Sequence, residues 1–196
     1  GGITLLPACP NRIFADTCDY KMYPAQLLLE RMGYVVKYPD KLHSYCCGQM
    51  YHSQHNQKQE ELSLNSLQKL VDSSQLLLLD NSSCATFAKQ SGLETRDYNE
   101  FICERIIKNK IKRSYDKIAV HFDCSTTKAG HNELILSILK LCAFEVVVTN
   151  EIKCCGFAGD KGFTMPELNA SSLDDVKKKV SDCQVGVTFN RSCQIG

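Results

Sequence analysis

Apolar residues recur along the chain in two patterns, which predict alternating strands and helices. Short apolar runs predict buried strands at 3–6, 34–38, 76–80, 118–122, 144–149 and 185–189. Between the runs, apolar residues return every three or four positions, which predicts helices around Leu27, Leu28 and Met32; Leu64, Leu67, Leu70 and Val71; Leu134, Ile138 and Leu141; and Leu173, Val176 and Val180. Strands that alternate with helices favour right-handed crossovers and a parallel sheet covered by helices. The pattern therefore predicts an α/β fold.

The order of these elements occurs twice. Cys46-Cys47-Gly48 matches Cys154-Cys155-Gly156 at an offset of 108, and residues 75–84 match 184–193 at an offset of 109. Upstream, 3–9 corresponds to 118–124, and the segment after Leu29 corresponds to the one after Leu139. We predict two tandem βαβαβ-like repeats, 1–112 and 113–196, related by a pseudo-two-fold axis, with the second repeat truncated at its C-terminus.

The cysteines recur with the repeat. Each copy carries one cysteine, a Cys-Cys-Gly and a further cysteine, and each of these follows a predicted strand. The carboxyl ends of parallel strands meet at the edge of an α/β sheet that binds ligands, and helix N-termini there favour thiolates. We therefore expect two sets of sulfur ligands, which are Cys9, Cys46, Cys47 and Cys84 in the first repeat and Cys124, Cys154, Cys155 and Cys193 in the second.

Composition narrows what these cysteines do. The chain has 12 cysteines in 196 residues, and neighbouring cysteines are poor disulfide partners because ring closure strains the peptide between them. Two thiolates on one turn can instead share a metal centre, so metal or cluster binding is favoured over a disulfide framework. Four sulfurs suit tetrahedral zinc or an iron–sulfur cluster, and spacing alone leaves both open. Zinc ribbons, however, usually show short Cys-x-x-Cys knuckles, which this chain lacks.

Charge and hydropathy exclude other classes. The 23 Lys and Arg nearly balance the 22 Asp and Glu, so there is no electrostatic footprint for nucleic acid or an anionic membrane. The longest aliphatic run, 76–79, is far shorter than the roughly 20 residues that span a bilayer.

Other residues have plainer interpretations. Free cysteine is a common small core residue, so we expect Cys18, Cys103, Cys142 and Cys183 to serve packing. Histidines are more often core or surface residues than ligands, and His52, which closely follows the first Cys-Cys-Gly, is the leading candidate among them. Asn81 and Asn190 are expected to cap the helices that follow them.

The cysteine pattern resembles the cysteine-rich CCG domain. That domain occurs in heterodisulfide reductase catalytic subunits, in the iron–sulfur subunits of glycolate oxidase and anaerobic glycerol-3-phosphate dehydrogenase, and in lactate-utilisation proteins. Residues 154–163, 166–171 and 190–196 more narrowly resemble the C-terminal end of bacterial FAD-linked, iron–sulfur D-lactate dehydrogenases. One departure concerns Cys84, which lacks the Cys-x-x-Cys of heterodisulfide-reductase-type members. Each half thus has four motif cysteines, which argues against a non-cubane cluster and leaves a four-thiolate cluster or zinc.

The resemblance implies an electron-transfer domain of a flavin-dependent 2-hydroxyacid oxidoreductase of the D-lactate type. The eight cysteines above would hold an iron–sulfur cluster, of the 4Fe-4S type, in one or both repeats, with zinc in one repeat as the alternative. Electrons would pass from FAD in an upstream domain, through a ferredoxin-like domain of the same protein, toward a quinone or another acceptor. This implies a cytoplasmic location, peripheral at the inner face of the membrane, and no activity for the domain alone. Two further functions remain open, a zinc-stapled docking module and thiol–disulfide chemistry at the vicinal cysteines.

Overall fold

A computed structural model describes residues 1–14, 24–107, 111–149, 154–157 and 161–196. The chain forms two compact units, unit 1 from Gly1 to Ile102 and unit 2 from Cys103 to Gly196. Each unit is described by itself. The repeat boundary after residue 112 and the pseudo-two-fold axis stay predictions.

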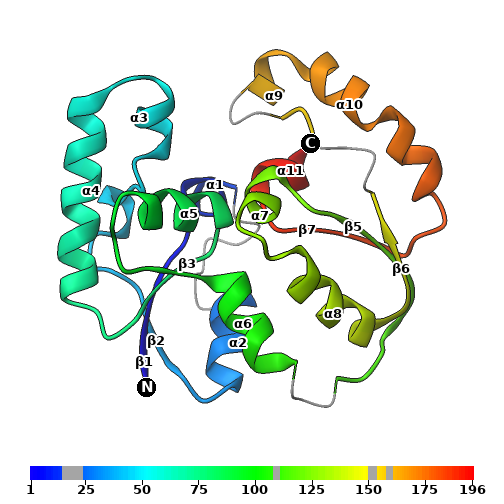
Figure 1. Cartoon of the computed structure of the whole chain (residues 1–196), viewed down its shortest axis with the longest axis horizontal. Helices are drawn as coiled ribbons and strands as arrows, with labels where there is room; N and C mark the ends of the chain where they lie inside the picture. The colour runs from blue at the N-terminus through cyan, green and yellow to red at the C-terminus, as the bar shows by residue number, and fades with distance from the viewer. Residues whose placement is uncertain (15–23, 108–110, 150–153, 158–160) are drawn as a thin grey trace. The chain divides into compact units, whose positions relative to one another are not determined.

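Unit 1 is a parallel sheet with helices on both faces (Figure 1). Its strands lie in the order β2-β1-β3-β4, and every neighbouring pair is parallel. Its elements are, in chain order, β1 (Gly2–Leu6), α1 (Cys9–Ile13), α2 (Pro24–Arg31), β2 (Val35–Lys37), the 3₁₀ helix η2 (Leu42–Ser44), α3 (Gln49–Ser53), α4 (Gln57–Asp72), β3 (Leu77–Leu79), α5 (Ser82–Gln90), β4 (Arg96–Asp97) and α6 (Tyr98–Ile106).

Unit 2 repeats the same plan with one strand fewer among its described residues. Its sheet has the order β6-β5-β7, again parallel throughout. Its elements are β5 (Tyr115–His121), α7 (Cys124–Lys128), α8 (Asn132–Cys142), β6 (Ala143–Val148), α9 (Lys161–Thr164), α10 (Pro166–Lys179), β7 (Val185–Thr188) and α11 (Arg191–Ile195). The predicted α/β class with two parallel sheets is confirmed.

Strand pairing reproduces the sequence repeat residue by residue. In unit 1, Thr4 pairs with Leu77. In unit 2, Ala119 pairs with Gly186. Ala119 lies 115 positions after Thr4, and Gly186 lies 109 positions after Leu77. On the other side, Thr4 pairs with Lys37 and Ala119 pairs with Val147. Equivalent residues of the two repeats therefore occupy equivalent places in the two sheets.

Glutamine side chains mark this equivalence at the start of the sheets. The Oε1 atom of Gln75 accepts from the Gly2 amide at 2.7 Å, and that of Gln184 accepts from the Asp116 amide at 2.6 Å. Each glutamine precedes the third strand of its unit and satisfies an amide near the start of the first strand.

The core of unit 1 lies between the sheet and helices α4 and α5. Leu6, Leu77 and Leu79 pack there against Leu67 of α4 and Ala88 of α5. Successive strand residues point to opposite faces. Leu5 and Leu78, which are fully buried, therefore face the other side of the sheet.

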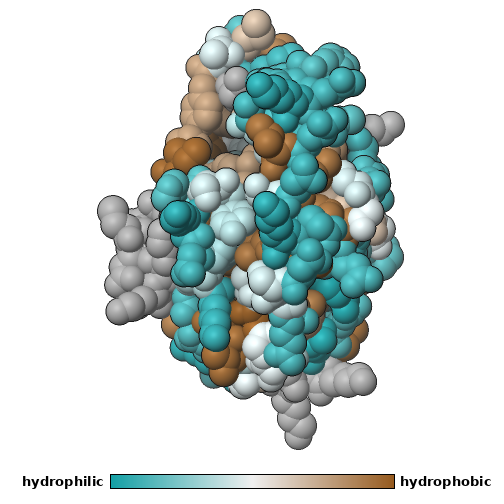
Figure 2. Space-filling view, turned by 90° about the vertical axis from the view of Figure 1, so that its left-hand side faces the viewer, coloured by the Kyte–Doolittle hydropathy of each residue, from teal (hydrophilic) through white to brown (hydrophobic). Residues whose placement is uncertain are grey.

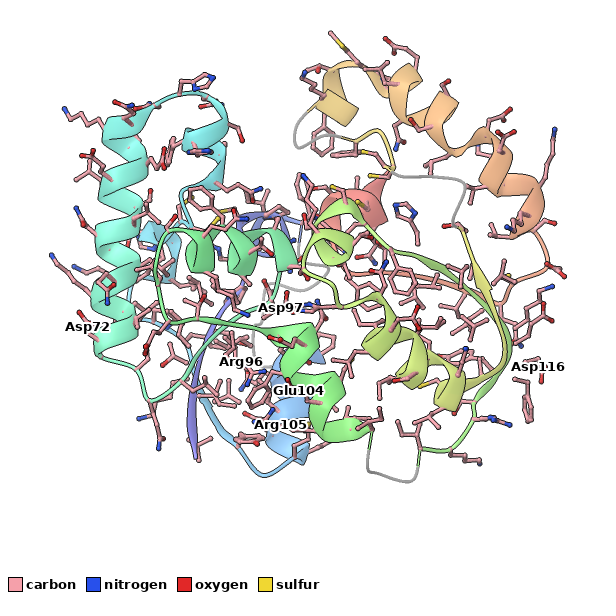
Figure 3. All side chains as sticks on the ribbon, viewed as in Figure 1. Asp72, Arg96, Asp97, Glu104, Arg105 and Asp116 are labelled. Carbon is pink, nitrogen blue, oxygen red and sulfur yellow. The ribbon has the colours of Figure 1, made fainter. Side chains whose placement is uncertain are left out.

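Helices α2 and α6 lie side by side in unit 1. The Tyr98 hydroxyl of α6 donates to the Ala25 carbonyl of α2 at 3.4 Å, and the rings of Tyr34 and Phe101 are 5.5 Å apart. The Asp97 carboxylate begins α6 by accepting from the amides of Asn99 at 2.7 Å and Glu100 at 3.1 Å (Figure 3). Strand β4 and helix α6 thus extend the basic repeat.

The surface is largely polar where α4 faces solvent. Figure 2 shows a mostly hydrophilic face on this side of unit 1, with isolated apolar residues. Among the described helices, none is both long enough and apolar enough to cross a bilayer.

Candidate metal centres

The two Cys-Cys-Gly turns have the same geometry. Gly48 and Gly156 adopt positive φ angles of 92° and 78°, a backbone region open chiefly to glycine. Their amides point back to the first sulfur of each pair, with N–Sγ distances of 3.4 Å for both Cys46 and Cys154. The next amide along, that of Gln49 or of Phe157, hydrogen-bonds the second sulfur of its pair. Each turn therefore presents two sulfurs to backbone donors that stabilise thiolate charge.

Helix N-termini position the remaining cysteines. Cys9 begins α1 three positions after the last residue of β1, and Cys124 begins α7 three positions after the last residue of β5. Cys84 and Cys193 are each the third residue of a helix that follows the third strand of its unit. The sequence motif thus places every one of these cysteines beyond the carboxyl end of a parallel strand, as the sequence predicted.

Asparagine caps hold the last cysteine of each repeat. Asn81 and Asn190 have nearly the same backbone angles, φ/ψ −133/124° and −134/126°. Each side-chain oxygen accepts from the amide two residues on, Ser83 or Ser192, at 3.0 Å. The expected caps are confirmed, and they fix the helical turns that carry Cys84 and Cys193.

In unit 1 the four motif cysteines form a connected series of thiols. Thiol–thiol interactions link Cys9 to Cys46, Cys46 to Cys47, and Cys47 to Cys84. Cys47 is buried, and the other three are partly exposed. Residues from three separate loops of the chain therefore meet at one place.

Proximity raises the pKa values of Cys9, Cys46 and Cys47. Hydrogen bonding to Cys46, then burial, raises the pKa of Cys9, and hydrogen bonding to Cys47 raises that of Cys46. For Cys47 the hydrogen bond with Cys46 lowers the pKa, but the one with Cys84 and burial outweigh it. Several thiolates this close would repel one another. A bound cation would favour deprotonation of the thiols, and its positive charge would offset the repulsion between the thiolates.

Arg12 brings positive charge to this series. Its Nη2 atom donates to the Cys9 sulfur at 3.0 Å and to the Tyr45 carbonyl at 2.7 Å, while Nη1 donates to the Leu42 carbonyl at 2.5 Å. The guanidinium therefore ties α1 to the loop that leads into Cys46. It also lowers the pKa of Cys9, against the stronger effects of Cys46 and burial.

Unit 2 gathers a different set of donors. The sulfurs of Cys155 and Cys193 are 3.0 Å apart, and together with a ring nitrogen of His121 they form a group whose donor atoms lie within 4.8 Å of one another. Cys124 and Cys154 are exposed and lie outside this group. The structure thus brings together two of the four cysteines expected in this repeat and adds a histidine.

The thiol pair of unit 2 shares its charge unevenly. The hydrogen bond with Cys193 lowers the pKa of Cys155 to about 6, although burial opposes it. The same hydrogen bond raises the pKa of Cys193. One thiolate in this pair is therefore accessible near neutral pH.

The histidine in the site is not the one that the sequence favoured. His52 lies on α3, where its Nδ1 atom is 3.1 Å from the Glu60 carboxylate and its ring is 5.2 Å from that of Phe87. His121, at the end of β5, is the one that meets sulfur. Its sequence signal was its position three residues before Cys124 at a strand end.

The other cysteines stay outside the two thiol sets. Cys103 is buried, and Cys142 and Cys183 are half-buried. Burial raises the pKa of Cys142 and of Cys183, as for inert packing thiols. Cys18 lies outside the described residues.

Comparison with known proteins agrees with this geometry. Residues 118–195, from β5 to α11, match the family model of the cysteine-rich domain, CCG. The chain is also similar to "Lactate utilization protein A 1" of Bacillus mycoides (strain KBAB4), with 22% identity over 188 residues that cover 85% of this chain and 76% of that protein. Unit 2 therefore carries the sequence features of a cysteine-rich domain, and unit 1 repeats its strand order and motif positions.

Proposed function

We propose that the chain is an electron-transfer module of lactate oxidation, in which the cysteines of unit 1 hold an iron–sulfur cluster. The observation that carries the proposal is the connected series from Cys9 through Cys46 and Cys47 to Cys84. The similarity to a lactate utilization protein supports the metabolic context.

The donor set of unit 1 fits such a group. Four thiols are the usual ligand complement of a 4Fe-4S cluster, and the raised pKa values of Cys9, Cys46 and Cys47 reflect how closely these thiols are packed. When bound, the cluster supplies one-electron transfer. The chain's own groups would tune it, because the Arg12 guanidinium and the amides of Gly48 and Gln49 all place positive charge beside the sulfurs.

The wider assembly follows from the sequence resemblance. We propose that electrons reach this module from FAD in an upstream flavin domain, through a ferredoxin-like domain, and leave toward a quinone or another acceptor. A cytoplasmic location, with peripheral attachment at the inner face of the membrane, would suit that path. The hydroxyacid is oxidised at the flavin, so the module alone is expected to be inactive.

Reversible colour tests the proposal. Protein purified without oxygen should absorb broadly in the visible range, and reduction should bleach that absorbance, because thiolate-bound iron is coloured and redox-active whereas zinc is neither. The double variant Cys46→Ser/Cys47→Ser should lose the absorbance. The matched control Cys142→Ser, which removes a thiol outside the series, should keep it.

Two results would count against this function. A colourless wild-type protein that contains zinc in unit 1 would favour the docking module. A metal-free protein whose vicinal thiols react readily would favour thiol–disulfide chemistry.

A further inference from the structure

The two repeats differ at the end of their first strand. The strand register makes His121 of unit 2 equivalent to Leu6 of unit 1, 115 positions earlier. Leu6 is 3% exposed and belongs to the hydrophobic core of its unit. Where one repeat places a core leucine, the other places an imidazole beside two sulfurs.

Hydrogen bonding fixes the tautomer of this imidazole. The Thr149 hydroxyl donates its one proton to the Val120 carbonyl at 3.2 Å, and its oxygen lies 3.3 Å from His121 Nδ1. With that proton on the Val120 carbonyl, the Thr149 oxygen accepts from His121, which favours the neutral tautomer that carries its ring proton on Nδ1. The lone pair is then on Nε2.

That lone pair is buried without a hydrogen-bond partner. His121 Nε2 is shielded from solvent and has no hydrogen-bond partner among the residues that the structure describes. A buried nitrogen lone pair without a donor is unfavourable, so such atoms call for an explanation. Metal-bound histidines show the same arrangement: one ring nitrogen binds the ion, and the N–H of the other ring nitrogen donates a hydrogen bond to a nearby acceptor.

The nearby carboxylate is engaged elsewhere. Asp123 caps α7, since its Oδ1 atom accepts from the amides of Ser125 at 3.0 Å and Thr126 at 3.1 Å. Its Oδ2 atom accepts from the Thr126 hydroxyl at 2.8 Å. Among the described residues, the candidate donor group here consists of His121, Cys155 and Cys193, and the Asp123 carboxylate is not part of it.

The spacing of these donors suits one tetrahedral ion. A zinc ion bound at about 2.3 Å from sulfur and about 2.1 Å from nitrogen separates its ligand atoms by roughly 3.5–3.8 Å. The donor atoms all lie within 4.8 Å of one another, and the two sulfurs, 3.0 Å apart, would move apart by less than 1 Å to bind such an ion. Two thiolates with one imidazole form a ligand set typical of zinc.

We propose that unit 2 binds a divalent metal ion of the zinc class through His121 Nε2 and the thiolates of Cys155 and Cys193. One tetrahedral position remains for a further ligand. The two repeats then hold different centres, with sulfur alone in unit 1 and mixed nitrogen and sulfur in unit 2. The site stands on its own donors and does not depend on the cluster proposed for unit 1.

Zinc content of the full chain tests this site. The wild-type protein, purified without added metal and without oxygen, should contain one zinc for unit 2. His121→Leu, which installs the residue that unit 1 has at this position, should lose that zinc equivalent. His121→Cys should retain it, because a third thiolate replaces the imidazole. His52→Leu is the matched control, since His52 pairs with Glu60 away from the sulfurs, and it should retain the zinc.

Cobalt provides a readout of the ligands themselves. In protein loaded with Co²⁺ in place of zinc, sulfur-to-metal charge-transfer absorbance follows the number of metal–sulfur bonds. The unit 2 contribution is obtained by subtracting the spectrum of His121→Leu from that of the wild-type protein or of His121→Cys. It should rise by about half from wild type to His121→Cys, as two thiolates become three.

The outcomes separate this site from the proposed function. Zinc retained in a folded His121→Leu protein, or lost in a folded His121→Cys protein, would overturn the site. X-ray absorption at the zinc edge of the wild-type protein decides the matter if the variants do not fold, because a first shell without imidazole would also overturn it. Loss of iron in His121→Leu would mean that the histidine serves a cluster instead. Absence of iron from the wild-type protein would refute the function proposed for unit 1 and leave the zinc site standing.

Discussion

Arg12→Met should loosen the thiol series of unit 1. The change keeps the apolar stem of the side chain and removes three hydrogen bonds, two to the carbonyls of Leu42 and Tyr45 and one to the Cys9 sulfur. Hydrogen bonds from a charged donor contribute about 1.5–3 kcal/mol each when buried, but Arg12 is half-buried and the bonds share one group. We therefore expect a loss of about 2–4 kcal/mol in the unfolding free energy of the metal-free protein.

Urea denaturation followed by circular dichroism measures this loss, and iron content measures its consequence. Arg12→Met should unfold at lower urea and retain less iron than the wild-type protein. Arg12→Lys keeps the charge, but a single ammonium cannot reach all three acceptors in the same geometry, so it should fall between the two. Position 127, the equivalent of Arg12 in unit 2, is a threonine, so zinc content should not change. Unaltered unfolding and iron content in Arg12→Met would refute this account of Arg12.

Three further substitutions test the helix caps, the turns and the core. Asn190→Ala should lower the free energy of unfolding by about 1 kcal/mol, because the α11 cap is lost. Asn81→Ala should lower it further, because Asn81 is buried. Variants as stable as the wild-type protein in urea titrations would contradict the capping role. Gly33→Ala should lower the free energy of unfolding by about 1–2 kcal/mol because of its positive φ alone. Gly156→Ala should lower it further and release the unit 2 zinc, because the added Cβ would lie 2.8 Å from a backbone oxygen of α10. Similar melting temperatures for the two variants would refute this difference. Leu67→Ala should cost about 2–5 kcal/mol by leaving a cavity between α4 and the sheet, and a calorimetric change below about 1 kcal/mol would show that this core relaxes freely.

The sequence predicted the parts of the fold that repeat. Apolar runs and cysteines recur at matching offsets, so the sequence predicted the repeated strands and their parallel direction, whereas the strand order and register come from the structure. Strand β4 could not, because its two residues, Arg96 and Asp97, are polar and form no apolar run. Pairing with β3 creates that strand, and pairing is a property of the folded chain.

The candidate sites divide in the same way. The eight cysteines follow from the motif, but the assignment of His121 depends on Thr149, a residue 28 positions away that parallel pairing brings alongside. The role of Arg12 likewise depends on carbonyls 30 and 33 positions away. Such partners leave no periodic signal in a single sequence, whereas a duplicated Cys-Cys-Gly does.

The metal content of the wild-type chain tests the central claim most directly. Iron, zinc and acid-labile sulfide would be measured together on protein purified without oxygen and never exposed to added metal. We predict iron and sulfide in near-equal amounts, about four of each per chain as for a 4Fe-4S cluster in unit 1, together with one zinc in unit 2. Zinc without iron or sulfide would contradict an electron-transfer role and make the chain a zinc-bound scaffold.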